Sequence, residues 1–364
     1  MQIRELDTPA LLIDLDIFER NLARVGDYAH QHGLRLRPHT KTHKSPIVGN
    51  KQLASGAAGL TVAKVGEAEV MLRSQTPDIL IAYPVIGRSK LERLMEVAKK
   101  TRLTVALDSM HAAHQLSDAS RAAQVIVGVL AETDVGLGRV GVTPGPELIE
   151  LARGIQRLPG LSFEGVTFYP GHIKDVGENG RRQLQELTQV LGSILCDFQN
   201  AGIPVSIVSG GSTPTLYLSH EVNGLTEIRP GTYVYNDVNT VQSGACGWED
   251  CAASILVTVV STARPGQIIV DGGSKTFSTD RLANSREVTF GRVVDAPECA
   301  FRKMNEEHGY IDVTGAKGQF SVGDRLQIIP NHICVAVNLH ERVYGMRNGK
   351  VEEIWEVEGR GKLQ

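Results

Sequence analysis

The chain has 364 residues, of which 41% are hydrophobic and 22% charged, and its formal net charge is −3 at pH 7. This composition is ordinary for a soluble globular protein, and the near-neutral charge argues against a nucleic acid or a membrane surface as partner. We see no signal peptide at the N-terminus and no apolar run near the roughly 20 residues that a membrane span requires. The 5 cysteines are scattered and odd in number, which is not typical of a disulfide framework, so we expect a cytoplasmic protein.

The first two thirds of the chain repeat a short β-branched run, a turn and an amphipathic stretch. Strands are predicted at 34–41, 59–64, 78–85, 103–108, 125–133, 165–169, 205–209 and 226–229. Helices are predicted between them, at 65–73, 89–100, 145–156 and 181–200. This alternation indicates parallel βαβ units, and eight such units fit a closed (β/α)8 barrel with its chemistry at the C-terminal strand ends. An open doubly wound sheet is the alternative.

The last third of the chain has a different pattern, with strand-like runs and almost no helical periodicity. The runs lie at 253–261, 267–271, 288–294, 310–313, 325–329, 342–346 and 351–357. They predict an all-β domain, to which the apolar residues 10–15 are expected to add a strand. The predicted organisation is therefore a barrel of residues 16–240 and a β domain of residues 1–15 and 241–364.

The first predicted barrel strand is unusually basic. A period of two puts Leu34 and Leu36 on one face and four basic residues on the other. The basic residues are Arg35, Arg37, His39 and Lys41. Burying such a row requires compensating anions, for which we expect a phosphorylated cofactor and the carboxylates of Asp108 and Asp134. The alternatives are a solvated basic edge and a patch that binds external phosphate.

Lys41 stands at the end of this strand, where a lysine suits imine formation. Low dielectric and the neighbouring cations His43 and Lys44 favour a neutral amine that can attack an aldehyde. The run RPHTKTHKSP at 37–46 resembles the cofactor-lysine segment of the D-threonine aldolase and D-serine dehydratase family. Those enzymes have the alanine-racemase-like fold, fold type III among pyridoxal phosphate (PLP) enzymes. The resemblance implies that Lys41 holds PLP as a Schiff base.

Further segments resemble the same family along the whole chain. Residues 63–69 resemble its second strand–helix turn, and residues 134–141 the loop whose arginine, here Arg139, approaches the phenolic oxygen of the cofactor. Tyr169 matches a family tyrosine near the pyridine ring. Without the resemblance, the loop would be read as an ordinary turn and Tyr169 as a core aromatic residue.

Two glycine-containing turns follow the seventh and eighth predicted strands, where (β/α)8 barrels often bind phosphate through backbone N–H groups. Both turns also resemble family segments. The first consists of Ser209, Gly210, Gly211, Ser212 and Thr213, and the second contains Gly231, Thr232 and Tyr233. We therefore predict that they hold the cofactor phosphate.

A metal pair is predicted in the β domain at His332 and Cys334. On a strand, residues two apart share a face, so these two side chains could bind one metal ion, although coincidental packing is the commoner reason for such a pair. The family has a His-x-Cys or His-x-Asp metal pair at this segment. The cysteine form present here favours zinc, and the aspartate form suits manganese.

The resemblance implies a PLP- and divalent-metal-dependent lyase for D-3-hydroxy amino acids. We predict a D-threonine aldolase that forms glycine and acetaldehyde, because residues 229–237 and 271–275 look closer to aldolase-type members. The cysteine ligand favours the alternative, a D-serine or D-3-hydroxyaspartate dehydratase that forms a 2-oxo acid and ammonia. An amino-acid racemase and a non-catalytic PLP-binding protein are less favoured, because of the metal pair and the β domain.

The catalytic base is predicted from position alone. Aldolase-type members are expected to have a histidine near Asp175, and the nearest histidine here is His172. His308 is a second polar candidate that could instead cap a turn. By analogy with the family, we expect a small-molecule substrate and a homodimer.

Overall fold

The computed structural model describes residues 1–283 and 288–364. They form two compact units. The β unit contains Met1–Ala23, Thr42–Lys44 and Thr232–Arg360, and the barrel unit contains Arg24–Lys41, Ser45–Gly231 and Gly361–Gln364. The predicted domains, residues 16–240 and residues 1–15 with 241–364, stay a prediction.

The barrel unit contains an eight-stranded parallel sheet with the strand order β2-β9-β8-β7-β6-β5-β4-β3. Its strands are β2 (Arg35–Leu36), β3 (Leu60–Val62), β4 (Asp78–Ile81), β5 (Arg102–Leu107), β6 (Val127–Glu132), β7 (Leu161–Thr167), β8 (Ile207–Gly210) and β9 (Glu227–Ile228). A parallel bridge between His39 and Thr61 joins the two end strands. This arrangement confirms the predicted barrel and excludes the open sheet.

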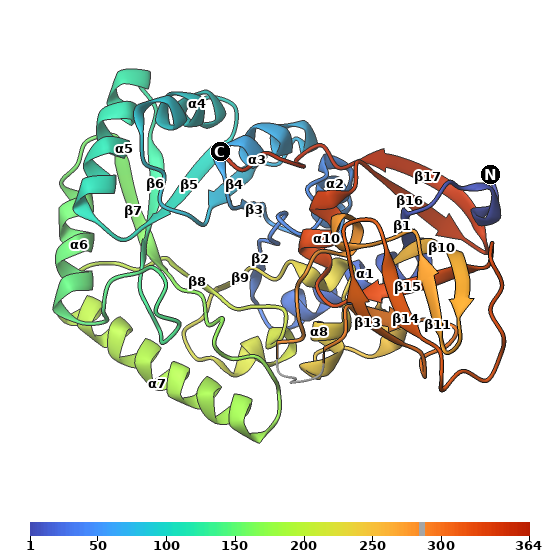
Figure 1. The fold of residues 1–364 in the computed structure, drawn as a ribbon. Helices are drawn as coiled ribbons and strands as arrows, with labels where there is room; N and C mark the ends of the chain where they lie inside the picture. Colours follow the sequence, from blue (N-terminus) through green and yellow to red (C-terminus); the bar gives the residue numbers. More distant parts are fainter. Residues whose placement is uncertain (284–287) are drawn as a thin grey trace. The chain divides into compact units, whose positions relative to one another are not determined.

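Helices follow the barrel strands and cover their outer side, as Figure 1 shows for α4 to α7. They are α2 (Pro46–Ala54), α3 (Val65–Met71), α4 (Arg88–Ala98), α5 (Met110–Ala123), α6 (Pro146–Gln156) and α7 (Glu178–Asn200), with the short η2 (Leu72–Ser74) and η3 (Leu216–Glu221). Local signals start them: the Ser109 hydroxyl caps α5, and Pro146 occupies the first turn of α6. The four predicted helices are confirmed.

The basic row predicted on the first strand is not buried as a whole, because β2 ends at Leu36. Arg37 is buried, whereas Arg35 and Lys41 are exposed. The Arg37 guanidinium, 1% exposed, donates to Asp78 Oδ1 at 2.7 Å and to Glu227 Oε2 at 2.9 Å. The carboxylates predicted from the sequence, Asp108 and Asp134, are not the partners of Arg37. Asp108 instead accepts the backbone N–H of Gly141, and Asp134 accepts N–H groups of its own loop, because both side chains lie beyond the strand ends.

The polar network continues from Glu227 toward the C-terminal ends of the strands. The Ser209 hydroxyl donates to Glu227 Oε1 at 2.6 Å, and Arg229 donates to the Ser209 oxygen and to the Phe168 carbonyl oxygen. These contacts join β2, β4, β8 and β9 through side chains. Every charged group in this set therefore has a partner of opposite charge or a hydrogen bond, as burial requires.

The β unit contains a nine-stranded sheet with the order β11-β14-β13-β12-β15-β10-β1-β16-β17 and a further β10–β11 pairing. Its strands are β1 (Ala10–Asp14), β10 (Ala253–Arg264), β11 (Gln267–Val270), β12 (Gly291–Val293), β13 (Ala300–Met304), β14 (Gly309–Asp312), β15 (Arg325–Pro330), β16 (Arg342–Arg347) and β17 (Lys350–Glu356). The predicted β domain is confirmed, including the N-terminal strand, which pairs with β10 and β16. Strand β13 was not predicted.

Short helices interrupt the β unit, and one of them overturns a local prediction. They are α8 (Val238–Gln242), α9 (Ser274–Phe277) and α10 (Ile333–Leu339), and α1 (Leu15–Gln31) follows β1. The strand predicted through His332 and Cys334 is wrong. His332 is the N-cap residue of α10 and Cys334 lies in its first turn, because the Asp237 carboxylate accepts the N–H of Ile333 and starts the helix there.

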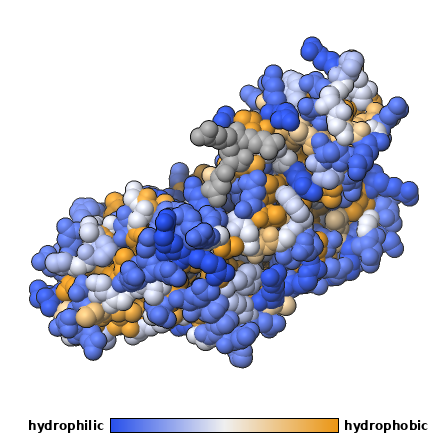
Figure 2. Space-filling view, turned by 90° about the horizontal axis from the view of Figure 1, so that it is seen from below, coloured by the Kyte–Doolittle hydropathy of each residue, from blue (hydrophilic) through white to orange (hydrophobic). Residues whose placement is uncertain are grey.

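Among the described residues, no helix is both long enough and apolar enough to cross a membrane. The surface drawn in Figure 2 is mostly hydrophilic, with hydrophobic residues in smaller areas between.

The buried charges yield a stability prediction. Replacing Arg37 with leucine should lower the free energy of unfolding by about 3 kcal/mol, because Asp78 and Glu227 would lose their closest and most buried cationic partner. They would keep only the longer contacts with the partly exposed Arg35 and Arg102. The measurement is denaturant unfolding of the cofactor-free protein. Arg88→Leu is the control, since that arginine is 93% exposed and should change the free energy by about 0.5 kcal/mol or less. Equal effects of the two substitutions would contradict the prediction.

Candidate functional site

Three of the predicted cofactor residues meet around one aromatic ring in the barrel unit. The Lys41 Nζ lies 5.8 Å from the centroid of the Tyr169 ring, and the Arg139 Cζ lies 5.0 Å from the same centroid. Lys41 follows β2, Arg139 is in the loop after β6, and Tyr169 follows β7. All three therefore stand beyond the C-terminal ends of barrel strands, where (β/α)8 enzymes carry their reactive groups.

The residues after Lys41 leave the barrel unit. Thr42–Lys44 belong to the β unit, in which Lys44 is buried and has a left-handed backbone with φ of 52°. Its carbonyl oxygen accepts the N–H of Gly359 at 2.8 Å. A lysine held in this way is part of the β-unit framework, which leaves Lys41 as the lysine of this motif that reaches the Tyr169 ring.

His172 packs against the loop that carries Arg139. A Cβ atom built on Gly136 would lie 3.3 Å from the His172 ring, and the buried His172 Nδ1 has no hydrogen-bond partner among the described residues. The same loop is fastened by Asp134, which accepts the N–H groups of Gly136 and Gly138. Burial raises the pKa of Asp134, but these backbone donors outweigh burial and hold the pKa below its ordinary value.

The turn at 209–213 has the properties of an anion-binding site. Gly211 has φ of +84°, and Ser212 and Thr213 are buried. Within the described part of the chain, the backbone N–H groups of Ser212 and Thr213 have no acceptor. Buried N–H groups without acceptors are costly unless a ligand or water satisfies them. The Ser209 hydroxyl, in contrast, is committed to Glu227 and Arg229.

The second predicted phosphate turn divides between the two units. Gly231 lies in the barrel unit, where its N–H donates to Thr213 Oγ1 at 3.3 Å, next to the first turn. Thr232 and Tyr233 lie in η4 (Thr232–Val234) of the β unit. There the Thr232 hydroxyl is 3.8 Å from the Cys334 Sγ.

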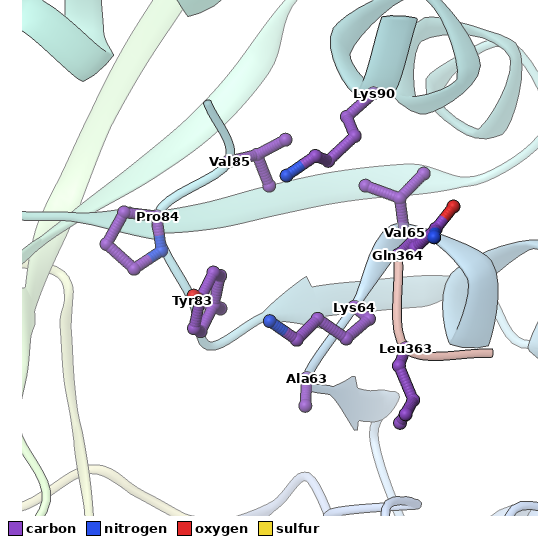
Figure 3. A pocket seen from close by; sticks show the side chains of 9 residues that line it. All are labelled: Ala63, Lys64, Val65, Tyr83, Pro84, Val85, Lys90, Leu363 and Gln364. Carbon is purple, nitrogen blue, oxygen red and sulfur yellow. The ribbon is translucent and has the colours of Figure 1, made fainter. Parts of the chain in front are cut away.

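The second strand–helix turn forms a small pocket at the rim of the barrel, shown in Figure 3. The Lys64 Nζ lies 3.6 Å from the centroid of the Tyr83 ring, and the Glu67 carboxylate accepts the N–H of Ala63. The last residues of the chain complete this pocket, because Gln364 accepts the N–H of Gly66 at 2.8 Å. The turn is therefore held by its own carboxylate and by the C-terminal segment.

In the β unit, one carboxylate organises the predicted metal pair. Asp237 Oδ2 lies 3.1 Å from His332 Nδ1 and accepts the N–H of Ile333 at 3.0 Å. This contact places a proton on Nδ1 and leaves Nε2 as the ring nitrogen available to a metal, the arrangement common among metal-binding histidines. Asp237 is fully buried, so its position is determined by the packing of the unit.

Cys334 is next to His332 and to two hydroxyl groups. The Cys334 charge and the Asp237 carboxylate together raise the pKa of His332 well above its ordinary value, so a metal that binds Nε2 would displace a proton from it. The Thr42 hydroxyl is 3.2 Å from the Cys334 Sγ. Among the residues that the structure describes, there is no group of three or more metal-binding side chains, so this pair could hold a metal only with water or substrate as further ligands.

The residues around Tyr169 in the barrel unit and the His332–Cys334 pair in the β unit are related through neighbouring positions in the chain. Lys41 and Gly231 belong to the barrel unit, and the next residues, Thr42 and Thr232, both contact Cys334 in the β unit. The second candidate base, His308, lies outside both groups, in the turn between β13 and β14 where its carbonyl oxygen accepts the N–H of Asn305.

Sequence reasoning missed three polar residues of these surroundings: Asp237, Arg229 and Glu132. Each carries a detectable signal. Glu132 is a single acidic residue at the end of the apolar run of β6, and Arg229 and Asp237 are the first and last residues of a segment already singled out by its family resemblance. A charged residue at the C-terminal end of a barrel strand indicates function more often than packing.

Comparison with known proteins identifies the family. Residues 13–238 match the family described as "Alanine racemase, N-terminal domain", and residues 252–346 match "Putative serine dehydratase domain". The 3-hydroxy-D-aspartate aldolase of Paracoccus denitrificans is 32% identical over 376 residues, which cover 100% of this chain and 94% of that enzyme. The chain belongs to this alanine-racemase-like family of aldolases and dehydratases. Because these are PLP-dependent lyases, the chain is a PLP-dependent lyase, as the sequence predicted.

Solved structures of the family agree along the full length. The D-threonine aldolase from Filomicrobium marinum has a TM-score of 0.93 and 30% identity, covering 100% of this chain and 98% of that one. The D-threo-3-hydroxyaspartate dehydratase from Delftia sp. HT23 has a TM-score of 0.90 and 31% identity, with 98% of each chain covered. The same dehydratase has been solved as a histidine-to-alanine variant and, two positions further along, as a cysteine-to-alanine variant in the metal-free form.

Proposed function

We propose that this protein is a PLP- and divalent-metal-dependent lyase of D-3-hydroxy amino acids, acting as a D-threonine aldolase that forms glycine and acetaldehyde. The observation that carries the proposal is the His332–Cys334 pair held by Asp237, in a chain whose Lys41 stands beside Tyr169 and Arg139. The proposed assembly is a homodimer, by analogy with the family.

The residues of the barrel unit fit PLP. The unsatisfied N–H groups of Ser212 and Thr213, with Gly231 beside them, suit a phosphate, and Lys41 supplies the amine that carries the cofactor. Arg139 offers a guanidinium for the phenolic oxygen. When bound, PLP supplies an electron sink for breaking a bond at the amino-acid Cα.

The residues of the β unit fit a divalent metal. An imidazole nitrogen and a thiolate are a donor set that favours zinc, and the Asp237 carboxylate orients the imidazole. With two protein ligands, open positions remain for water and for a substrate hydroxyl. When bound, such a metal acts as a Lewis acid toward that hydroxyl. The metal-free cysteine variant of the related dehydratase supports the same assignment for Cys334.

His172 is the proposed base that takes the proton of the substrate hydroxyl. Its Nδ1 is buried without a partner among the described residues, and its ring packs against the Arg139 loop at Gly136. A histidine with an uncommitted ring nitrogen can accept a proton, which a fully hydrogen-bonded one cannot do as readily. Lys41 is the proposed group that supplies a proton to Cα after the Cα–Cβ bond has broken, so that glycine forms.

The dehydratase reaction is the second candidate, and the cysteine ligand favours it. The related dehydratase carries its cysteine two positions after its histidine, as Cys334 follows His332 here. In that reaction Lys41 would remove the Cα proton and the hydroxyl would leave, giving a 2-oxo acid and ammonia. Both reactions need the same cofactor and metal residues, so product analysis separates them.

The first prediction concerns the lysine. Borohydride treatment of the PLP-loaded protein, followed by peptide mapping, should find the pyridoxyl group on Lys41, because Lys44 is anchored on Gly359 within the β unit. Lys41→Ala should lose the near-visible absorption of the bound cofactor, and Lys64→Ala, the control at the barrel rim, should keep it. Label on Lys44 or Lys64 would contradict the assignment.

The second prediction concerns the metal. Cys334→Ala should lose bound metal and activity but retain PLP, because the thiolate is proposed as one of two protein ligands. Metal content is measured by elemental analysis and PLP by absorbance. Cys196→Ala is the matched control, since this exposed cysteine lies on α7. Full activity of a metal-free preparation of the unsubstituted protein would contradict the metal proposal.

The third prediction separates the two reactions. D-threonine should yield glycine and acetaldehyde without appreciable 2-oxobutyrate, and L-threonine should not react. D-threonine deuterated at Cα should show at most a small isotope effect, because aldol cleavage leaves the Cα hydrogen in place. Elimination would remove the Cα hydrogen, so the deuterated substrate would show a primary isotope effect where that step limits the rate. Rapid formation of 2-oxobutyrate and ammonia would overturn the aldolase and leave the dehydratase.

A further inference from the structure

Glu132 is a buried carboxyl group at the C-terminal end of a barrel strand that none of the steps above uses. It is the last residue of β6, is 6% exposed, and pairs in register with Thr167 of β7. Its carbonyl oxygen accepts the N–H of Val142 at 3.0 Å. Glu132 therefore stands at the base of the loop that brings Arg139 to Tyr169.

The side chain of Glu132 is not satisfied in the way that the buried carboxylate of Glu227 is. Glu227 is fully buried, and its two oxygens accept hydrogen bonds from Arg37 and Ser209. The Oε2 atom of Glu132 is buried and has no hydrogen-bond partner in the described part of the chain. A buried carboxylate oxygen without a donor is costly, so this atom requires a proton, a water or a ligand group.

The charges around Glu132 place it in the cofactor surroundings. Burial raises its pKa to about 7, Arg229 and Arg139 act in the opposite direction, and Asp108 adds a smaller upward contribution. Near neutral pH the group is therefore divided between its charged and neutral forms. Carboxyl groups with this behaviour in an enzyme cleft are candidates for functional roles.

We infer that Glu132 is a positioning residue of the cofactor site whose buried carboxyl takes up a proton from solvent when an anionic cofactor enters. The inference rests on the proposed function, because the anion in question is the cofactor phosphate. Added negative charge disfavours the ionised carboxyl, so binding and protonation assist each other.

Linkage gives the direction of the pH effect. A neutral Glu132 accommodates an anion better than a charged one does, so affinity for the anion should fall as pH rises through neutrality. In a Glu132→Gln variant the side chain is always neutral, and this part of the pH dependence should disappear. Glu132→Asp keeps the titrating group and should retain it.

The experiment uses pyridoxine 5′-phosphate, which lacks the aldehyde and forms no bond to Lys41. Calorimetric titration of the cofactor-free protein at pH 7.5, in buffers of different ionisation enthalpy, measures the protons taken up on binding. The unsubstituted protein should take up a fraction of a proton more than Glu132→Gln. The variant's affinity should also fall less steeply between pH 6 and 9. Glu69→Gln, whose glutamate pairs with Arg93 on the outer helices, is the control and should behave like the unsubstituted protein.

A second readout needs no ligand. Infrared difference spectra of the cofactor-free protein between pH 5 and 9 should contain the carbonyl band of a protonated carboxyl that titrates near neutrality and is missing in Glu132→Gln. Equal proton uptake by the two proteins, or an unchanged band, overturns the inference and leaves the proposed function standing. Failure of the unsubstituted protein to bind pyridoxine 5′-phosphate overturns both.

Discussion

The buried ion pair between Arg37 and Glu227 is the constraint on which the barrel unit depends. A guanidinium that is only 1% exposed must stay paired with carboxylates. The strands β2, β4 and β9 are therefore held where Asp78 and Glu227 can both contact Arg37. Glu227 in turn accepts from Ser209, and Ser209 accepts from Arg229. The framework inside the barrel and the turn at 209–213, the proposed phosphate site, are thus parts of one hydrogen-bonded chain.

The proposed metal pair, His332 and Cys334, depends in a similar way on a single buried carboxylate. Asp237 starts α8 by accepting the N–H of Thr240, and starts α10 through Ile333 while it holds His332. One side chain therefore decides both where the helices begin and which imidazole nitrogen of His332 is held by hydrogen bonding. Because Thr42 and Thr232 contact Cys334, the chain leads from this pair directly to Lys41 and to Gly231.

The sequence predicted the architecture well because the relevant signals are local. Alternating strands and helices marked the barrel, and period-two runs with turns marked the β domain, including the N-terminal strand β1. Local signals failed where a distant residue decides the outcome. His332 and Cys334 were expected on a strand, and a carboxylate about a hundred residues earlier makes them the start of a helix. Asp108 and Asp134 failed as predicted partners of Arg37 for the same reason, because its actual partners, Asp78 and Glu227, are distant in the sequence.

By itself, the sequence determined the fold class, the family and the lysine that is proposed to carry the cofactor, since these follow from periodicity and from the motif at 37–46. Only the tertiary structure decided that Lys41 and Arg139 share the Tyr169 ring, that Asp237 orients His332, and that Glu132 is buried without a partner. The physical reason is that hydrogen bonding, charge and burial depend on which side chains meet in space. A single sequence does not show which residues a hundred positions apart are in contact.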